Sequence, residues 1–238
     1  MALTSSATYQ FNRHFSAGLG IPLYFNHASS TTGTTSSEGL GDLFARLGAA
    51  WKGPALNFGT SLTGSAPTGD KNKGLSTGHA TFDWTNRVDH DFGVVTPFLA
   101  AGLANSVTST RFYGRPFTSF GNVAHFEGGT DVDLGRFFSV TLSGYDIAPW
   151  GNQAVYSRIV THGAAGPGGT HGRVFETNQQ TTGGASLTRD EGFTAGVTAN
   201  PTPYLELELG YTRSVAFALN TVSFGAVVNV SKLFRPAQ

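Results

Sequence analysis

Hydrophobic side chains alternate with polar or small ones along the first segment of the chain. From Tyr9 to Phe25 every odd-numbered position except Arg13 carries an apolar residue. Successive side chains on a β-strand point to opposite faces, so this pattern gives one apolar and one polar face. Two interpretations fit: one strand over 7–26, which exceeds the usual length of roughly 3 to 10 residues, or a hairpin with a three-residue turn at 12–14. A two-residue turn is excluded because it would reverse the alternation.

The same alternation recurs along most of the chain. It predicts strands at 42–51, 55–66, 78–88, 122–134, 138–142, 193–199, 205–211 and 222–230. The segment 92–105 is also predicted as a strand, but it is apolar on both faces and shows no register. Between 147 and 188 the pattern weakens, and strands at 153–161 and 172–178 are predicted there. With both of these strands the total is about 12 and both chain ends lie on the periplasmic side. With neither, about 10 strands remain, together with a long external or plugging loop.

Short and long connections alternate between these strands. Tight turns are expected at 52–54, 89–91, near 135 and at 200–203, whereas long polar loops cover 27–41, 67–77, 106–121 and 147–188. Outer-membrane barrels show this asymmetry, with the short turns in the periplasm. The sequence therefore predicts an all-β fold, a single transmembrane antiparallel up-and-down β-barrel over 1–238 with about 12 strands; 10 to 14 fit the pattern.

Composition indicates whether the apolar face of the strands points outward or inward. A soluble barrel is apolar inside and a membrane barrel is apolar outside, and both give the same alternation. Charged residues make up 13% of the chain, about half of the quarter found in soluble domains. With 32 glycines and 12% aromatic residues, the chain is typical of a wall that faces lipid. We expect Trp51, Trp84 and Trp150 to lie in interfacial aromatic belts.

Charge and cysteine content exclude other classes of protein. The formal net charge is zero and no basic run occurs, so nucleic-acid binding is not expected. The chain has no cysteine, which removes disulfides and cysteine metal sites. The start, Met-Ala-Leu-Thr-Ser-Ser, has neither the basic region nor the apolar core of a signal peptide. For a bacterial outer-membrane protein, we expect this numbering to begin at a mature or recombinant start.

Three glycine-containing motifs resemble a known family. They are Gly39-Leu40-Gly41-Asp42-Leu43, Ala66-Pro67-Thr68-Gly69-Asp70 and Gly74-Leu75-Ser76-Thr77-Gly78. In these motifs the chain is similar to outer-membrane proteins of the MetA-pathway of phenol degradation family, most clearly over 15–105. The resemblance implies a barrel of 10 to 14 strands and uptake of aromatic or hydrophobic compounds, and it brings no established binding residues. The ending from Phe224-Gly225-Ala226 to Leu233-Phe234 also resembles the signal read by the barrel assembly machinery, except that 235–238 follow it.

The polar faces of the predicted strands would line the lumen of a membrane barrel. They carry Arg46, His79, Asp83, Arg87, His125, Glu127, Asp131, Asp133, Arg158, Glu206 and Glu208. Because the signs are mixed, these side chains can pair across a narrow interior, where a lone charge would be costly. Two interpretations remain open: a constriction that selects solutes by charge and size, or an ion-paired filling that closes the lumen.

Other chemistry has little support in the sequence. Glu127, Asp131 and Asp133 could bind a hard cation and His162 with His171 could bind zinc, but neither set has the spacing of a recognised metal loop. The stretch 163–172 is rich in glycine and lacks the Lys-Ser/Thr pair of a phosphate loop. No diagnostic nucleophile–base spacing appears. We therefore expect no cofactor, no metal and no enzyme activity.

The predicted function is an outer-membrane channel or transporter that passes small, hydrophobic or aromatic solutes through a narrow polar lumen. Its predicted partners are outer-membrane lipid and lipopolysaccharide, the barrel assembly machinery through the C-terminal strand, and the small-molecule solute. One alternative is a barrel with a closed lumen whose long loops bind a partner or an assembly. A less favoured alternative is a soluble lipid-binding barrel.

Overall fold

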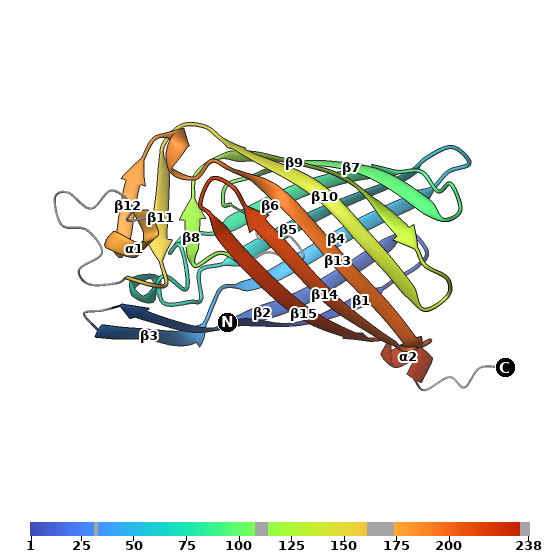
Figure 1. Ribbon diagram of the computed structural model, residues 1–238, viewed down its shortest axis with the longest axis horizontal. Coiled ribbons are helices and arrows are strands. Elements are labelled where there is room, and N and C mark those ends of the chain that lie inside the picture. Colours follow the sequence, from blue (N-terminus) through green and yellow to red (C-terminus); the bar gives the residue numbers. More distant parts are fainter. Residues whose placement is uncertain (31–32, 108–113, 161–173, 234–238) are drawn as a thin grey trace.

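One curved antiparallel sheet forms the wall of the molecule (Figure 1). The computed structural model describes residues 1–30, 33–107, 114–160 and 174–233. In these residues the sheet has 12 strands, of which β3 (Gly33–Leu40) lies off the main path beside β2 and leaves 11 in the wall. The wall strands, in order, are β1 (Ala2–Gln10), β2 (Phe15–Ser30), β4 (Leu43–Lys52), β5 (Asn57–Ala66), β6 (Thr81–Asp89), β7 (Val95–Ala104), β9 (Val123–Asp133), β10 (Phe138–Pro149), β13 (Asp190–Thr202), β14 (Leu205–Ser214) and β15 (Leu219–Val228).

Short turns gather at one end of the wall and most long connections at the other, which confirms the predicted asymmetry. We call these the short-turn end, on the right in Figure 1, and the long-loop end, on the left. The C-terminal helix α2 (Val230–Leu233) lies at the short-turn end. The connection between β14 and β15 is the exception, because residues 215–218 return the chain in a tight turn at the long-loop end. Phe234 and the residues after it, part of the predicted assembly signal, lie outside the described residues.

Of the two interpretations of the first segment, the structure shows the hairpin, with its turn at residues 12–14. Phe11 N–H donates to the carbonyl of Phe15 at 2.9 Å, which leaves Asn12, Arg13 and His14 in the loop. The Asn12 side chain accepts the backbone N–H groups of His14 and Phe15 at 2.8 and 2.9 Å. This closure is typical of asparagine in tight turns. Arg13, the break in the apolar stripe, therefore lies at the edge of the wall.

The two wall strands predicted between 147 and 188 are wrong. Residues 153–157 form β11 (Gln153–Ser157), which joins β8 (Phe117–Phe120) and β12 (Gln180–Gly183) in a separate three-stranded sheet. The described part of 172–178 contains the short helix α1 (Val174–Thr177). This sheet lies beyond the long-loop end of the wall, where the single turns η1 (Lys71–Lys73) and η2 (Ala185–Leu187) also lie (Figure 1).

The prediction that both chain ends lie on the periplasmic side is wrong as well. The first segment forms two wall strands instead of one, and the segment 147–188 contributes none instead of two. The number of wall strands is therefore odd. Met1 lies partway along the wall, where its carbonyl accepts the backbone N–H of Phe25 at 2.8 Å. The hydrogen-bonded order ends at β1 and β15, and no pairing between these two strands is described.

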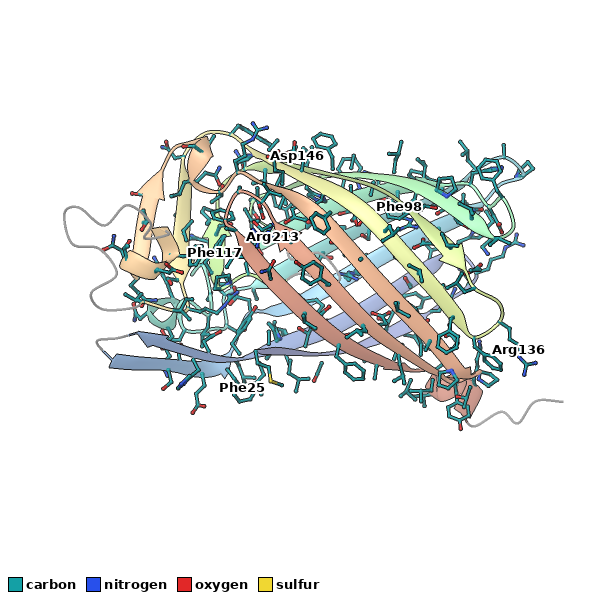
Figure 2. The ribbon with its side chains drawn as sticks, in the orientation of Figure 1. Phe25, Phe98, Phe117, Arg136, Asp146 and Arg213 are labelled. Atoms are coloured by element: carbon teal, nitrogen blue, oxygen red, sulfur yellow. The ribbon has the colours of Figure 1, made fainter. Side chains whose placement is uncertain are left out.

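The apolar side chains of the strands point outward, as predicted. Large exposed hydrophobic residues follow one another across neighbouring strands in register, among them Leu47, Leu62, Trp84 and Leu103. Charged residues on the outside lie toward the two ends: Figure 2 shows Asp146 and Arg213 near the long-loop end and Arg136 at the short-turn end. The result is an apolar band around the wall. None of the helices in the described residues is long and apolar enough to cross a membrane.

The outward apolar band predicts opposite outcomes for one charge placed on neighbouring residues. Leu62 is 47% exposed on the outside, and Ser61 faces the interior. Leu62→Arg should destabilise the barrel in lipid by about 2 to 4 kcal/mol, because it puts a cation into hydrocarbon. Urea unfolding in phospholipid vesicles measures this, with Ser61→Arg as the matched control. Equal losses from both variants would contradict the outward orientation.

Candidate functional site

Charged side chains of β6 and β9 meet inside the wall. Arg87 Nη2 donates to Asp131 Oδ2 at 2.8 Å, and its Nε lies 3.5 Å from Asp89 Oδ1. The second oxygen of Asp131 accepts the Thr141 hydroxyl at 2.6 Å. The Arg87 guanidinium also lies 3.7 Å from the centre of the Phe98 ring, a cation–π contact within the interior. The side chains of Arg87 and Asp131 stay 39% and 33% exposed, so the interior at this level is not filled.

A second polar group lies nearer the long-loop end of the same strands. His125 Nε2 is 3.2 Å from Asp83 Oδ2, and the Thr85 hydroxyl donates to the other oxygen of Asp83 at 2.6 Å. On β9, Glu127 accepts the Ser143 hydroxyl at 2.7 Å. In the described residues no group of three His, Asp or Glu side chains could hold a metal ion. His162 and His171 lie outside those residues.

The other predicted lumen residues lie in different places. Arg46 faces inward from β4 and donates to the Thr63 hydroxyl at 3.1 Å, and the half-buried Glu206 and Glu208 face inward from β14. Asp133 is exposed where β9 ends, at the short-turn end. His79 precedes β6 and stacks on Phe120 of β8 with ring centres 4.6 Å apart. Arg158 follows β11, outside the wall strands. That these eleven residues line a pore stays a prediction.

A small folded unit covers the long-loop end. We call residues 114–120, 150–160 and 174–189 the cap; it contains β8, β11, β12, α1 and η2. Its core is formed by Phe117, Val155 and Phe175, which are at most 3% exposed. Phe217 and Leu219 of the β14–β15 turn pack against this core, with Phe117 and Phe217 ring centres 5.3 Å apart. Figure 2 shows Phe117 at this end. The cap thus rests directly on the wall.

A buried ion pair joins the cap to the interior of the wall. Arg115 Nη2 donates to Asp190 Oδ2 at 3.1 Å, and the two side chains are 1% and 0% exposed. Asp190, the first residue of β13, also accepts the hydroxyls of Tyr145 at 3.3 Å and Ser214 at 2.6 Å. Residues of β10, β13 and β14 therefore position the carboxylate to which Arg115 of the cap donates. A Cβ at Gly192 would lie 2.7 Å from Tyr145 Oη, so glycine there leaves room for this contact.

Arg158 fastens the cap to the loop before β6. Its guanidinium donates to the carbonyls of Phe117 at 3.1 Å and Gly74 at 3.5 Å, and also to that of Arg115, and it lies 4.2 Å from the centre of the Tyr24 ring. Burial lowers the pKa of Arg158. Gly74 has φ +68°, and a Cβ there would overlap the Ser157 carbonyl, so the close approach of loop and cap requires glycine.

Below the cap a cluster of buried apolar residues lies inside the wall. Ala104, Val107, Val123, Tyr145 and Ile147 form this cluster and are at most 8% exposed. Packed apolar side chains and the Arg115–Asp190 pair thus lie inside the wall at the long-loop end. Toward the short-turn end the inner face of β6 and β9 carries partly exposed charges of both signs. The arrangement can restrict passage at one level and select by charge at another.

Sequence reasoning missed Arg115, Tyr145, Asp190 and Ser214. Arg115 lies in a segment predicted as a polar loop, 75 residues before Asp190. The one available signal was Asp190 itself, a carboxylate that directly precedes the clear alternation of 193–199.

Removing the carboxylate of Asp190 should release the cap. In Asp190→Asn, the buried Arg115 loses the charge of the Asp190 carboxylate, and breaking a buried pair from one side typically costs about 3 to 5 kcal/mol. We expect faster trypsin cleavage within the cap while the wall stays folded, as followed by the heat-dependent shift on SDS gels. Asp146→Asn is the control, because Asp146 is 41% exposed and 3.9 Å from Arg189, and such pairs contribute under about 1 kcal/mol. Equal cleavage of both variants would mean that the pair does not hold the cap.

Comparison with known proteins assigns the family and the fold. The family model described as "Putative MetA-pathway of phenol degradation" matches residues 3–145. A search of curated proteins finds no match. Among solved structures, the COG4313 outer membrane channel from Pseudomonas putida F1 is similar with a TM-score of 0.58 and 15% identity, over 95% of this chain and 79% of that chain. The fold is thus that of a bacterial outer-membrane β-barrel, and the chain belongs to the phenol-degradation MetA-pathway family.

Proposed function

We propose that this protein is a passive channel of the bacterial outer membrane for small solutes, and not an enzyme. The observation that carries the proposal is the partly exposed group of charges around Arg87 and Asp131 inside a wall whose outside is apolar. Charges that stay partly accessible in the interior can contact a passing solute, which charges sealed in a packed filling could not. The similar Pseudomonas putida protein, described as an outer membrane channel, supports the same conclusion.

Small aromatic compounds are the solute class that we propose. The family description refers to phenol degradation. Inside the wall, the Arg87 guanidinium already lies over the Phe98 ring at 3.7 Å. A planar guanidinium binds aromatic faces and can donate to a hydroxyl substituent at the same time. A phenol-like solute can therefore take over part of the contact between Arg87 and Phe98.

The cap controls entry in this proposal. In it, the cap and the buried cluster below it close the long-loop end, solutes pass only when the cap moves away from the wall, and the Arg115–Asp190 pair sets the cost of that movement. We further propose that the outward face of β15, with Phe224 exposed, is the segment that the assembly machinery recognises. Outer-membrane lipid and lipopolysaccharide are the proposed surroundings of the apolar band.

The buried apolar cluster below the cap also favours one other function. A barrel whose lumen stays shut by Val123 and Ile147 would present the cap as a binding surface for a partner protein. The two functions differ in whether release of the cap opens a path.

Release of the cap should therefore increase permeability. We expect Asp190→Asn to raise conductance in planar bilayers and phenol uptake into proteoliposomes above wild type, because the ion pair no longer holds the closed position. Asp146→Asn should match wild type. If Asp190→Asn loosens the cap and yet neither conducts nor admits phenol, the channel function is wrong and the binding function is favoured.

The central charges should set ion selectivity. In the Asp190→Asn background, Arg87→Gln leaves Asp89 and Asp131 without their cation, so the reversal potential under a salt gradient should shift toward cation selectivity. Asp131→Asn should shift it toward anions. An unchanged reversal potential in both variants would place the selective constriction elsewhere.

A further inference from the structure

One cation on the inner face of the wall has no anionic partner. Arg46 of β4 faces inward, because Leu47, the next residue, is 59% exposed on the outside. Its Nε donates to the Thr63 hydroxyl of β5 at 3.1 Å, and its side chain has no other partner within the described residues. The side chain is exposed although it faces the interior. The two terminal nitrogens of the guanidinium are therefore available to a ligand.

The strands around Arg46 carry no acidic residue. β1, β2, β4 and β5 contain neither Asp nor Glu. Asp83 lies two strands away on β6, and its Oδ2 is 3.2 Å from His125 Nε2. Asp42, which precedes β4, accepts the backbone N–H of Gly69 at 3.0 Å. An unpaired charge in a narrow interior is costly unless water or an anion approaches it, so the surroundings of Arg46 favour an anionic ligand.

An aromatic ring lies beside Arg46 on the same face of β4. Phe44 is two residues earlier, and a Cβ at Gly20 of β2 would overlap its ring, so the ring lies over Gly20 on the inner face. Gly18, opposite Arg46, and Gly48 add no side chain to this face. Alternate residues of a strand are about 7 Å apart. That spacing suits a ligand whose ring stacks on Phe44 while its charged group reaches Arg46.

We propose that Phe44 and Arg46 form a binding site for small aromatic carboxylates such as benzoate. The carboxylate accepts two parallel hydrogen bonds from the terminal nitrogens of Arg46, a planar fork that matches carboxylate geometry. The ring of the ligand stacks, offset, on the Phe44 ring. Passage of these anions through the wall rests on the proposed channel function, whereas their binding at Arg46 is measured without it.

Arg87, the other arginine on the inner face of the wall strands, does not offer the same site. Asp131 and Asp89 lie 2.8 and 3.5 Å from its guanidinium and match its charge. The Phe98 ring covers the guanidinium at 3.7 Å. Two carboxylates repel a third, so an anionic solute is favoured at Arg46 and a neutral one at Arg87.

The test is equilibrium binding of 4-fluorobenzoate to the full chain in a nonionic detergent, followed by fluorine NMR, with 4-fluorobenzyl alcohol as the neutral probe. Wild type should bind 4-fluorobenzoate more tightly than the alcohol. Arg46→Gln should weaken 4-fluorobenzoate binding about tenfold, because charge-assisted hydrogen bonds are lost, and should leave binding of the alcohol unchanged. Lys52→Gln is the matched control and should bind like wild type. Lys52 also faces inward from β4, but Asn57 opposite it donates to Asp89 at 2.8 Å, so a carboxylate already lies nearby.

A second pair of variants separates the ring from the charge. Phe44→Leu keeps an apolar side chain over Gly20 but removes the aromatic face, so binding of 4-fluorobenzoate should weaken while binding of acetate stays as in wild type. Arg46→Lys keeps the charge without the planar fork and should retain only part of the affinity. Folding of each variant is checked by its heat-dependent shift on SDS gels.

Three results would overturn the site at Arg46. They are wild-type binding of 4-fluorobenzoate by Arg46→Gln, an equal loss in Lys52→Gln, and equal affinity of wild type for the alcohol and the carboxylate. Wild-type binding by Phe44→Leu would overturn the aromatic class of ligand. Loss of binding in Arg46→Gln together with no conductance from Asp190→Asn would support this site and contradict only the channel function.

Discussion

Every backbone N–H and C=O inside a bilayer must find its partner within the protein, because hydrocarbon offers none. This requirement imposes the antiparallel pairing that runs from β1 to β15. Once the backbone is satisfied by neighbouring strands, side chains are divided only by the pleat, with alternate residues facing lipid or the interior. The apolar outer band and the charges inside are therefore two results of one constraint.

The same constraint explains where folded structure other than the wall is found. Apart from the short helix α2 at the other end, the folded backbone that is not part of the wall lies beyond the long-loop end, where water is available, and the cap is built there around three short strands. A cap of this size has a small apolar core, so its position depends on contacts with the wall. Asp190 supplies one contact and Phe217 another, one electrostatic and one apolar. A charge pair at 0–1% exposure is costly to bury, and separating the pair while both charges stay buried is costly as well. This favours a cap that is either fully bound to the wall or fully released.

Much of the wall could be predicted from the sequence, because each wall strand is read from a local pattern. Alternation locates most of the strands, and the parity of Tyr9 and Phe15 excludes a two-residue turn between them, while one long strand also fits. The cap could not be predicted in the same way. β8 and β12 have only four residues each, and β11 is buried almost throughout, so none shows a clear period. Arg115 and Asp190 look like ordinary loop residues until the fold brings them together. Alternation continues through Gly78–Ala80 and so predicts that His79 lies on a strand, although the strand begins at Thr81.

The odd number of wall strands has a consequence for the two edges of the sheet. β1 runs from the level of Tyr24 toward the short turns, and β15 runs from the long-loop end in the same direction. If these edges were to meet, their ladder would be parallel, with slanted hydrogen bonds that are slightly weaker per residue than those of the rest of the wall. A strand running the opposite way would instead pair antiparallel with both. The edges β1 and β15 are therefore the part of the wall that its own topology constrains least. The circumference of the barrel depends on how these two edges are paired.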